Sequence, residues 1–281
     1  GESVPIENYE VPRVRHNYKE TSDDKADWNR LMNAIADGIS RGEMTKVVSS
    51  REVEFTSETP YNVASILANL VDNNLNCFIF GYEKDGRTFV GASPEILVRH
   101  RGSEILSYAL AGTAPKDGPN AWTEEQLLTN TKNIIEHNIV RNRIVNTMRQ
   151  ITPHVTVGET GIMELSHLYH LRTIITAKDS TKSLVEWAKL LHPTPALGGE
   201  PREKALALLQ EYESHERGMY AAPFGFMKDM GDGIVVVAIR SALIMDNVLY
   251  AYAGCGVVAD SDADEEYAET NNKMRTILDA L

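Results

Sequence analysis

The sequence is poor in cysteine, in long hydrophobic runs and in basic charge. Its two cysteines, Cys77 and Cys255, form neither a CxxC pair nor a disulfide framework, so we expect a reducing cytoplasm as its compartment. No apolar stretch approaches the ~20 residues of a membrane-spanning helix, and the start GESVPIENYE is no signal peptide. The net charge of −12 argues against binding to nucleic acid or to an anionic membrane, because both require a basic surface.

Internal repeats and nucleotide-binding motifs are also missing. No repeat or low-complexity linker divides the 281 residues, which suffice for one large domain or two interlocked halves. The chain contains no GxGxxG motif and no P-loop, so nucleotide binding has no support. An anionic substrate could bind such an acidic chain only through a locally positive pocket or a bound cation.

Helices are predicted in five segments. Apolar residues recur at helical spacing from Trp28 to Ile39, after the cap candidate Ser22 and before Gly42. Further helices are predicted over 123–150, 181–191, 202–213 and about 262–280, the last of them capped by Ser261. Residues 1–22 are polar and contain proline, which predicts an irregular lead-in before a single domain over 23–281.

Strands are predicted between these helices. Residues 45–55 alternate like a strand, and 76–112 are typical of successive strands with turns at 85–86 and 101–102. Residues 162–177 are predicted as one strand, and 233–245 with 248–258 as a hairpin over Asp246-Asn247. Neighbouring hairpins favour an antiparallel α+β fold over the alternation of a Rossmann fold.

Two predicted helices carry carboxylates that could hold a metal. In the last helix Glu266, Glu269 and Lys273 share one face. Acids in a first helical turn usually face water, and spacing alone favours that interpretation. Glu136 lies in the helix predicted over 123–150. If both helices turned a glutamate inward, they would form the oxygen-rich site that Mg²⁺ prefers, and the ion could bridge the protein to an anion.

Lys46 and Glu95 could act as a base and an acid. Lys46 precedes an apolar strand, where a lysine usually extends its amine to solvent, although a buried lysine can be a general base. Glu95 lies between apolar residues in GASPEIL, and a glutamate in an apolar pocket is held protonated and can be a general acid. Taken alone, the residues favour a non-catalytic role for both, with the amine of Lys46 in solvent.

Three further residues interrupt the apolar strands near the C-terminus. Arg240 lies within IVVVAIRSALIM, and a buried arginine needs an anion. That anion is either a carboxylate ligand or a structural ion-pair partner, and the two are equally supported. Gly254 and Gly256 flank Cys255, and glycine inside a strand can mark close approach of the backbone to a ligand.

Nine segments, in order, resemble the chorismate-utilising enzymes. These comprise the isochorismate synthases, the salicylate synthases, and the large subunits of anthranilate and aminodeoxychorismate synthases. No single motif is decisive, but the ordered set is highly specific: KVVSSR, GASPEIL, LAGTA, KNIIEH, HLRT, LHPTPALGG, ERGMYAAPFG, AIRSA and AGCGVVADSDADEEYAET. The resemblance implies the family's α/β sandwich, in which antiparallel sheets enclose a central cavity and helices lie outside.

The resemblance also implies roles for matching residues. Glu136 and Glu269 match carboxylates that hold Mg²⁺, and Glu266 matches one that supports the metal through its ligands or through water. Lys46 matches the lysine that activates water, which the ammonia-using relatives lack, and Glu95 matches the acid that helps the C4 hydroxyl leave. The implied substrate contacts are Gly112, Thr113, His170, Ala196, Leu197, Tyr220, Arg240, Gly254, Gly256 and Lys273.

His167 and His170 are three residues apart in the predicted strand, so they should lie on opposite faces and should not bind one metal together. The resemblance places His170 at the substrate. We therefore expect His167 to serve packing alone.

The loop HPTPALGG indicates which reaction is catalysed. Salicylate and anthranilate synthases tend to have threonine at the position of Ala196, and the pair Ala196-Leu197 resembles the dedicated isochorismate synthases. With Lys46 present, the resemblance implies a Mg²⁺-dependent isomerase, an isochorismate synthase, that adds water at C2 of chorismate and removes the C4 hydroxyl. The alternatives are a salicylate synthase and a non-catalytic chorismate-binding homologue.

The resemblance implies a monomer without an amidotransferase subunit, and it leaves the menaquinone and catechol-siderophore pathways open. Asn133 departs from the family, because relatives often carry an acid one turn before the metal-binding glutamate. Ala222 and Cys255 replace a common glycine and a common alanine. The chain also starts after strands that longer relatives contribute, so we expect a short homologue or a core that lacks an N-terminal part.

Overall fold

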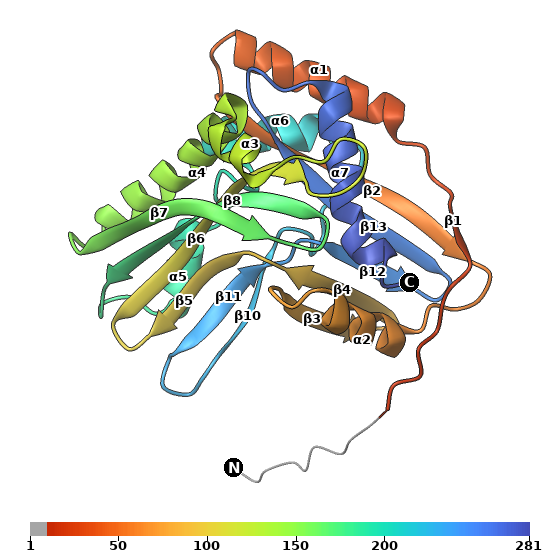
Figure 1. Ribbon diagram of the computed structural model, residues 1–281. Coiled ribbons are helices and arrows are strands. Elements are labelled where there is room, and N and C mark those ends of the chain that lie inside the picture. Colours follow the sequence, from red (N-terminus) through yellow and green to blue (C-terminus); the bar gives the residue numbers. More distant parts are fainter. Residues whose placement is uncertain (1–9) are drawn as a thin grey trace.

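The computed structural model describes residues 10–281, which form two antiparallel sheets with helices packed against them (Figure 1). The predicted α+β class is therefore confirmed. Residues 1–9 of the predicted lead-in lie outside the described residues. The end of the lead-in is not irregular, because β1 (Tyr18–Glu20) pairs with β2 (Lys46–Ser57).

The first sheet has the strand order β1–β2–β13–β12–β4–β3, and β9 (Gly199–Glu200) also pairs with β2. Its other strands are β3 (Phe78–Lys84), β4 (Arg87–Ser93), β12 (Ser241–Met245) and β13 (Val248–Val257). The hairpin turns predicted at 85–86 and 246–247 are confirmed. The long β2–β13 pair sets Gly254 opposite Ser50 and Gly256 opposite Val48.

The second sheet has the order β10–β11–β5–β6–β8–β7. These strands are β5 (Ile96–Arg101), β6 (Glu104–Pro115), β7 (Val155–Glu164), β8 (Leu168–Lys178), β10 (Pro223–Met227) and β11 (Gly233–Val237). The register between β6 and β8 shifts between Leu110 and Thr113, where Gly112 has a φ of 82°. This bulge redirects the end of β6, since glycine adopts positive φ without steric cost.

Two strand predictions were wrong. Residues 162–177 are not one strand: β7 ends at Glu164 and β8 begins at Leu168, with a turn between them. Residues 233–245 divide between β11 of the second sheet and β12 of the first. The chain crosses from one sheet to the other at Arg240, which has a φ of 53°. That left-handed conformation ends a strand, although the apolar pattern continues through it.

The helices are α1 (Lys25–Ser40), α2 (Val63–Asn73), α3 (Glu124–Thr129), α4 (Thr131–Arg149), α5 (Leu184–Leu191), α6 (Arg202–Tyr212) and α7 (Ala263–Leu278). Helix α2 was not predicted. The single helix predicted over 123–150 is wrong, because Asn130 ends α3 and its side chain caps α4 by accepting from Asn133 N. The predicted caps are also wrong: α1 begins after Asp24 instead of Ser22, and Asp262 instead of Ser261 caps α7.

Each sheet supplies a buried apolar face, and the helices cover these faces (Figure 1). Helix α4 packs on β6 and β8, while α7 packs on β13 and reaches β6 of the other sheet. These two helices therefore lie where side chains can reach the space between the sheets. Across residues 10–281 no helix combines the length and apolar character needed to cross a membrane.

Candidate active site

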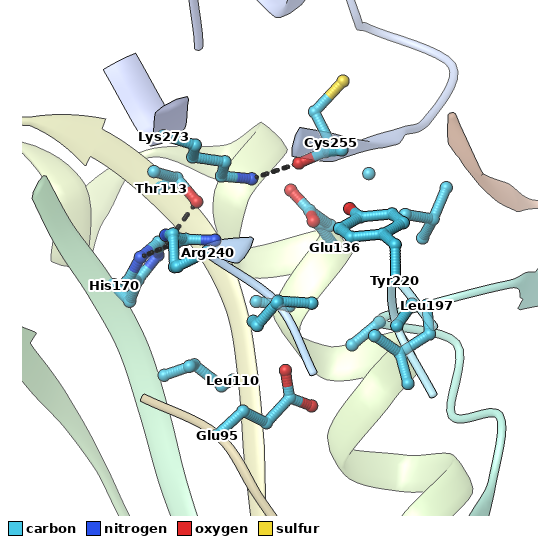
Figure 2. A pocket seen from close by; sticks show the side chains of 17 residues that line it. Glu95, Leu110, Thr113, Glu136, His170, Leu197, Tyr220, Arg240, Cys255 and Lys273 are labelled. Carbon is cyan, nitrogen blue, oxygen red and sulfur yellow. Dashed lines mark hydrogen bonds between the residues drawn. The ribbon is translucent and has the colours of Figure 1, made fainter. Parts of the chain in front are cut away.

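A cavity lies between the two sheets. Residues of β2 and β13 line it from the first sheet, and residues of β6 and β8 from the second. The structure brings most of the predicted site residues to this cavity (Figure 2): Glu95, Thr113, Glu136, His170, Ala196, Leu197, Tyr220, Arg240, Gly254, Gly256 and Lys273. It is a concave site with convergent polar groups, as expected for binding a small molecule.

Lys46 and Glu136 form a buried ion pair at one end of the cavity. Lys46 is the first residue of β2 and is fully buried, and its Nζ donates to Glu136 Oε1 at 3.1 Å. The solvent-exposed interpretation of Lys46 was therefore wrong. Burial acts to raise the pKa of Glu136, but Lys46 and Lys132 together hold it below its usual value. A Cβ on Gly256 would lie 2.2 Å from Glu136 Oε1, so glycine is required for this close approach.

Glu95 lies across the cavity from Glu136 and Lys273 (Figure 2). It sits in the link Pro94-Glu95, where the chain passes from β4 to β5. Its side chain is buried, and Oε1 has no hydrogen-bond partner among the described residues. Burial raises its pKa to about 8, against the opposing charges of Lys46, Arg240 and Lys273. The carboxyl group is therefore protonated at neutral pH and can donate a proton.

Arg240 takes part in none of the ion pairs found within residues 10–281. It is buried, its Nη2 donates to His170 Nε2 at 2.7 Å, and its Nε has no partner. Thr113 Oγ1 lies 3.0 Å from His170 Nδ1. Burial, together with the nearby Arg240 and Lys273, lowers the pKa of His170 far enough to keep the ring neutral. A buried guanidinium without an acidic partner favours an anionic ligand over a structural ion pair.

Tyr220 and Lys273 both lie close to Gly254. Burial raises the pKa of Tyr220 to about 12, so its hydroxyl remains a neutral donor. A Cβ on Gly254 would lie 2.6 Å from that hydroxyl oxygen. Lys273 donates to Gly254 O at 2.7 Å and pairs with Glu269 at 2.6 Å. Because Gly254 and Gly256 have no side chains, polar groups can approach the β13 backbone closely, as the sequence suggested.

Three carboxylates from α4 and α7 share one region with three lysines. Glu136 pairs with Lys46, Glu269 with Lys273, and Glu266 with Lys132. Burial raises the pKa of Glu266 to about 7, helped by the negative charges of Glu269 and Glu136. In the part of the chain that is described, no three His, Cys, Asp or Glu side chains are grouped closely enough to hold a metal ion.

These carboxylates nevertheless suit a divalent cation. Glu266 Oε2 is buried without a hydrogen-bond partner, and a carboxylate among like charges is stabilised by a cation. Oxygen atoms of Glu136, Glu266 and Glu269 are the ligand type that Mg²⁺ prefers. The interpretation of Glu266 as a solvent-facing residue is wrong, since only 2% of it is exposed.

Some predicted residues do not line the cavity directly. Lys46 lies behind Gly256, and Gly112 packs on Asn133. Glu266 and Glu269 are held by their lysines. His167 is not merely a packing residue, because it lies in the turn before β8 and bonds Asp117 at 2.7 Å and Asp279 at 2.5 Å.

Sequence reasoning missed two residues of α4. Lys132 lies four positions before Glu136, and this spacing places both residues on one helix face. The spacing could therefore have identified Lys132 as a neighbour of the site. His137 bonds Ala111 O at 3.1 Å and Thr173 Oγ1 at 2.7 Å, so it fastens α4 to β6 and β8. Burial lowers its pKa to about 4, which keeps the ring neutral.

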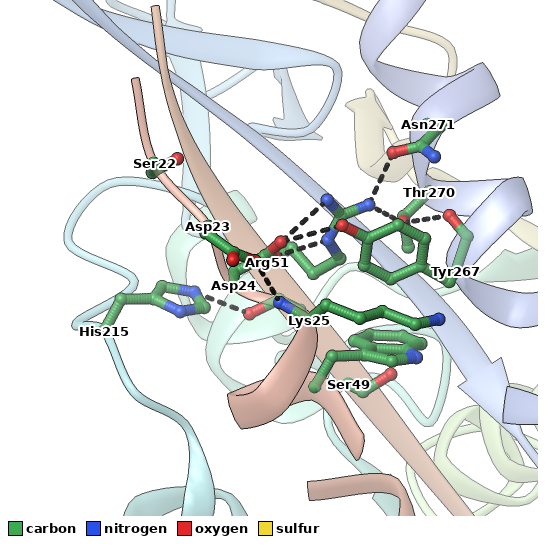
Figure 3. Close-up of polar contacts among 12 residues, drawn as sticks. Ser22, Asp23, Asp24, Lys25, Ser49, Arg51, His215, Tyr267, Thr270 and Asn271 are labelled. Carbon is green, nitrogen blue, oxygen red and sulfur yellow. Dashed lines mark hydrogen bonds and ion pairs between the residues drawn. The ribbon is translucent and has the colours of Figure 1, made fainter. Parts of the chain in front are cut away.

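A buried arginine holds α7 in place (Figure 3). Arg51 of β2 pairs with Asp24 and donates to Thr270 Oγ1 and Asn271 Oδ1 of α7. Its guanidinium also stacks 3.6 Å from the ring centroid of Tyr267, whose hydroxyl bonds Asp24. Since these contacts alternate along α7 with Glu266, Glu269 and Lys273, Arg51 fixes the helix that carries three site residues.

Comparisons with known proteins agree with this arrangement. The model of a family described as "Chorismate binding enzyme" matches residues 5–281. Isochorismate synthase MenF of Bacillus subtilis (strain 168) is 36% identical over 264 residues, which cover 92% of this chain and 56% of that protein. Anthranilate synthase component 1 of Arthrobacter globiformis is 34% identical over 257 residues, covering 87% of this chain and 48% of that protein.

A solved structure gives the same result for the fold. MenF, the menaquinone-specific isochorismate synthase from Escherichia coli, superposes with a TM-score of 0.86 at 29% identity, covering 97% of this chain and 66% of that chain. The chain spans about half the length of the curated relatives named above. Their similar identities, 36% and 34%, show that overall similarity does not distinguish an isochorismate synthase from an anthranilate synthase component.

Proposed function

We propose, on the premise that this chain belongs to the family of chorismate-binding enzymes, that it isomerises chorismate to isochorismate. Water would add at C2 and lose a proton, the ring double bonds would shift, and the C4–O bond would break. The leaving hydroxide would take up a proton and form water, so the reaction consumes no net water. The observation that carries this proposal is the pair of buried groups Lys46 and Glu95: Glu95 lines the cavity, and Lys46 reaches it behind Gly256 through its bond to Glu136, which also lines it.

Lys46 is the proposed base. It is held in one place by burial and by its bond to Glu136, so its amine is aimed from a rigid strand instead of a mobile surface position. From its neutral form the amine would take the proton of the attacking water. The resemblance to the water-using members of the family, in which a matching lysine activates water, supports water as the nucleophile here.

Glu95 is the proposed acid. Its raised pKa, about 8, keeps it protonated at neutral pH. Within the described residues no protein group forms a hydrogen bond with its Oε1. The proton is therefore available to the departing C4 hydroxyl. Figure 2 shows Glu95 and Glu136 on different sides of the cavity. Because Lys46 bonds Glu136, a ring held between the two carboxyl groups would meet the base and the acid on opposite sides.

The remaining groups would hold the two carboxylates of chorismate. Arg240 has no acidic partner within residues 10–281, and the Tyr220 hydroxyl is a neutral donor beside it. We assign them to the enolpyruvyl carboxylate, which a guanidinium can bind through two hydrogen bonds. Thr113 and His170 position Arg240 through their chain of hydrogen bonds.

Glu136 and Glu269 are the proposed ligands of Mg²⁺, with Glu266 supporting them. Bound there, the ion would supply the positive charge that holds the ring carboxylate. The acidic protein would then recognise a dianion through a local excess of positive charge. Ala196, which lines the cavity where salicylate and anthranilate synthases tend to carry threonine, favours stopping at isochorismate.

The test is to incubate the protein with chorismate, with and without Mg²⁺, and to separate the products by chromatography with mass detection. An isomer of unchanged mass that forms only with Mg²⁺ is the expected result. Salicylate with pyruvate would identify a salicylate synthase instead. Chorismate binding without any product would identify a non-catalytic homologue.

A further inference from the structure

Lys132 occupies a distinctive place between the carboxylates of α4 and α7. Its Nζ lies 2.6 Å from Glu266 Oε1 and 3.9 Å from Glu136 Oε2. Glu269 also lies near enough to favour its charged form. One ammonium group therefore stands among the three carboxylates that suit a divalent cation.

The three lysines of this region differ in their freedom to move. The side chain of Lys46 is 1% exposed and that of Lys273 is 9% exposed, whereas that of Lys132 is 20% exposed. The carboxylates of Glu136 and Glu266 are themselves almost inaccessible, at 8% and 3%. Lys132 is thus the positive charge that can withdraw to solvent, since its long flexible stem allows the ammonium to swing outward.

A buried carboxylate without a nearby cation is unstable, because it has left water without compensation. Lys132 provides that compensation to Glu266 and partly to Glu136. A divalent ion would provide it more strongly, but both cations cannot occupy the same space beside the same oxygens. The two therefore exclude each other, most directly at Glu266, whose Oε1 lies 2.6 Å from Lys132 Nζ.

We propose that Lys132 is a tethered counter-cation that competes with the divalent ion for Glu136 and Glu266. This inference rests on the proposed function, because it takes these glutamates as the metal site. Lys132 keeps the carboxylates assembled while the metal is absent, and it weakens metal binding by the free energy needed to displace it. The affinity of the site for Mg²⁺ is then set by a lysine as well as by its ligands.

The experiment measures Mg²⁺ binding by titration calorimetry in the parent protein and in Lys132→Met. Removing the competitor should tighten the Mg²⁺ dissociation constant by about tenfold or more. Without metal the variant should melt at a lower temperature than the parent. Added Mg²⁺ should raise its melting temperature more than that of the parent, because ligand stabilisation grows as the dissociation constant falls.

Lys189→Met is the matched control, because Lys189 is an exposed residue of α5 and its loss changes the net charge equally. The control should bind Mg²⁺ as the parent does. Lys132→Gln, which can still donate to Glu266 without a charge, should also bind Mg²⁺ more tightly than the parent. It serves as the test if the methionine variant does not fold, as judged by circular dichroism.

A double-mutant cycle gives a further check. In a Glu266→Gln background, Lys132→Met should change the Mg²⁺ affinity less than it does in the parent, because the competing pair is already broken. Unchanged or weaker Mg²⁺ binding in Lys132→Met and Lys132→Gln would mean that Lys132 supports Glu266 and does not compete. A parent protein that binds no Mg²⁺ would overturn the proposed metal site itself, and the role of Lys132 with it.

Discussion

Replacing Glu95 by glutamine should stabilise the protein by an amount that increases with pH. The side chain is buried, and the pKa of its carboxyl group is about 8 against an ordinary value of 4.5. Between these values the folded protein holds a proton that the unfolded chain has released. The parent therefore loses stability as the pH rises from 4.5 to about 8, and glutamine, which has no proton to lose, does not.

The size of this effect follows from the difference in pKa. Each unit corresponds to about 1.4 kcal/mol, so the full penalty above about pH 8 is roughly 5 kcal/mol. Close to pH 5 most of it has disappeared, because the unfolded carboxyl group is then only partly ionised. The advantage of Glu95→Gln over the parent should thus grow by roughly 3 kcal/mol between pH 5 and pH 8.

The assay is equilibrium unfolding in urea, followed by tryptophan fluorescence at several pH values from 5 to 9. Glu211→Gln is the control, because Glu211 is exposed on α6 and should give no such trend. A difference between Glu95→Gln and the parent that stays constant across this range would refute the reasoning. The same variant should lose turnover, and kcat/KM of the parent should decline above about pH 8 as the acid ionises.

Three further variants test the site. Lys46→Ala should abolish turnover while chorismate still binds, and turnover near the parent rate, measured by product chromatography, would remove Lys46 as the base. Glu136→Ala should abolish both activity and Mg²⁺ dependence, so an unchanged metal titration would contradict its assignment as a ligand. Arg51→Met should cost about 3 kcal/mol or more of stability in urea unfolding, because it leaves Asp24 partly buried without its partner. A loss below about 1 kcal/mol would show that Arg51 does not hold α7.

Local signals predicted most of the elements. The turns at 85–86 and 246–247 form two-residue hairpins as expected, because Asp85, Gly86 and Asp246 take the positive φ that such turns require. The errors arose where a local pattern continued through a break. Asn130 interrupts a helical periodicity by capping α4, and the apolar run through Arg240 continues although its two halves belong to different sheets.

The sequence by itself determined the family and the candidate residues, because the ordered motifs contain the carboxylates, the lysine and the glycines that gather in or around one cavity. Spacing could not decide which charged groups are buried, since burial depends on segments far apart in the chain. Glu95 is held protonated and Glu136 pairs with Lys46 only after both sheets and α4 enclose them. The contact of Lys132 with Glu266 likewise joins two helices 134 positions apart. Tertiary structure decided these contacts, because a charge acquires its partners and its proton affinity from the groups packed around it.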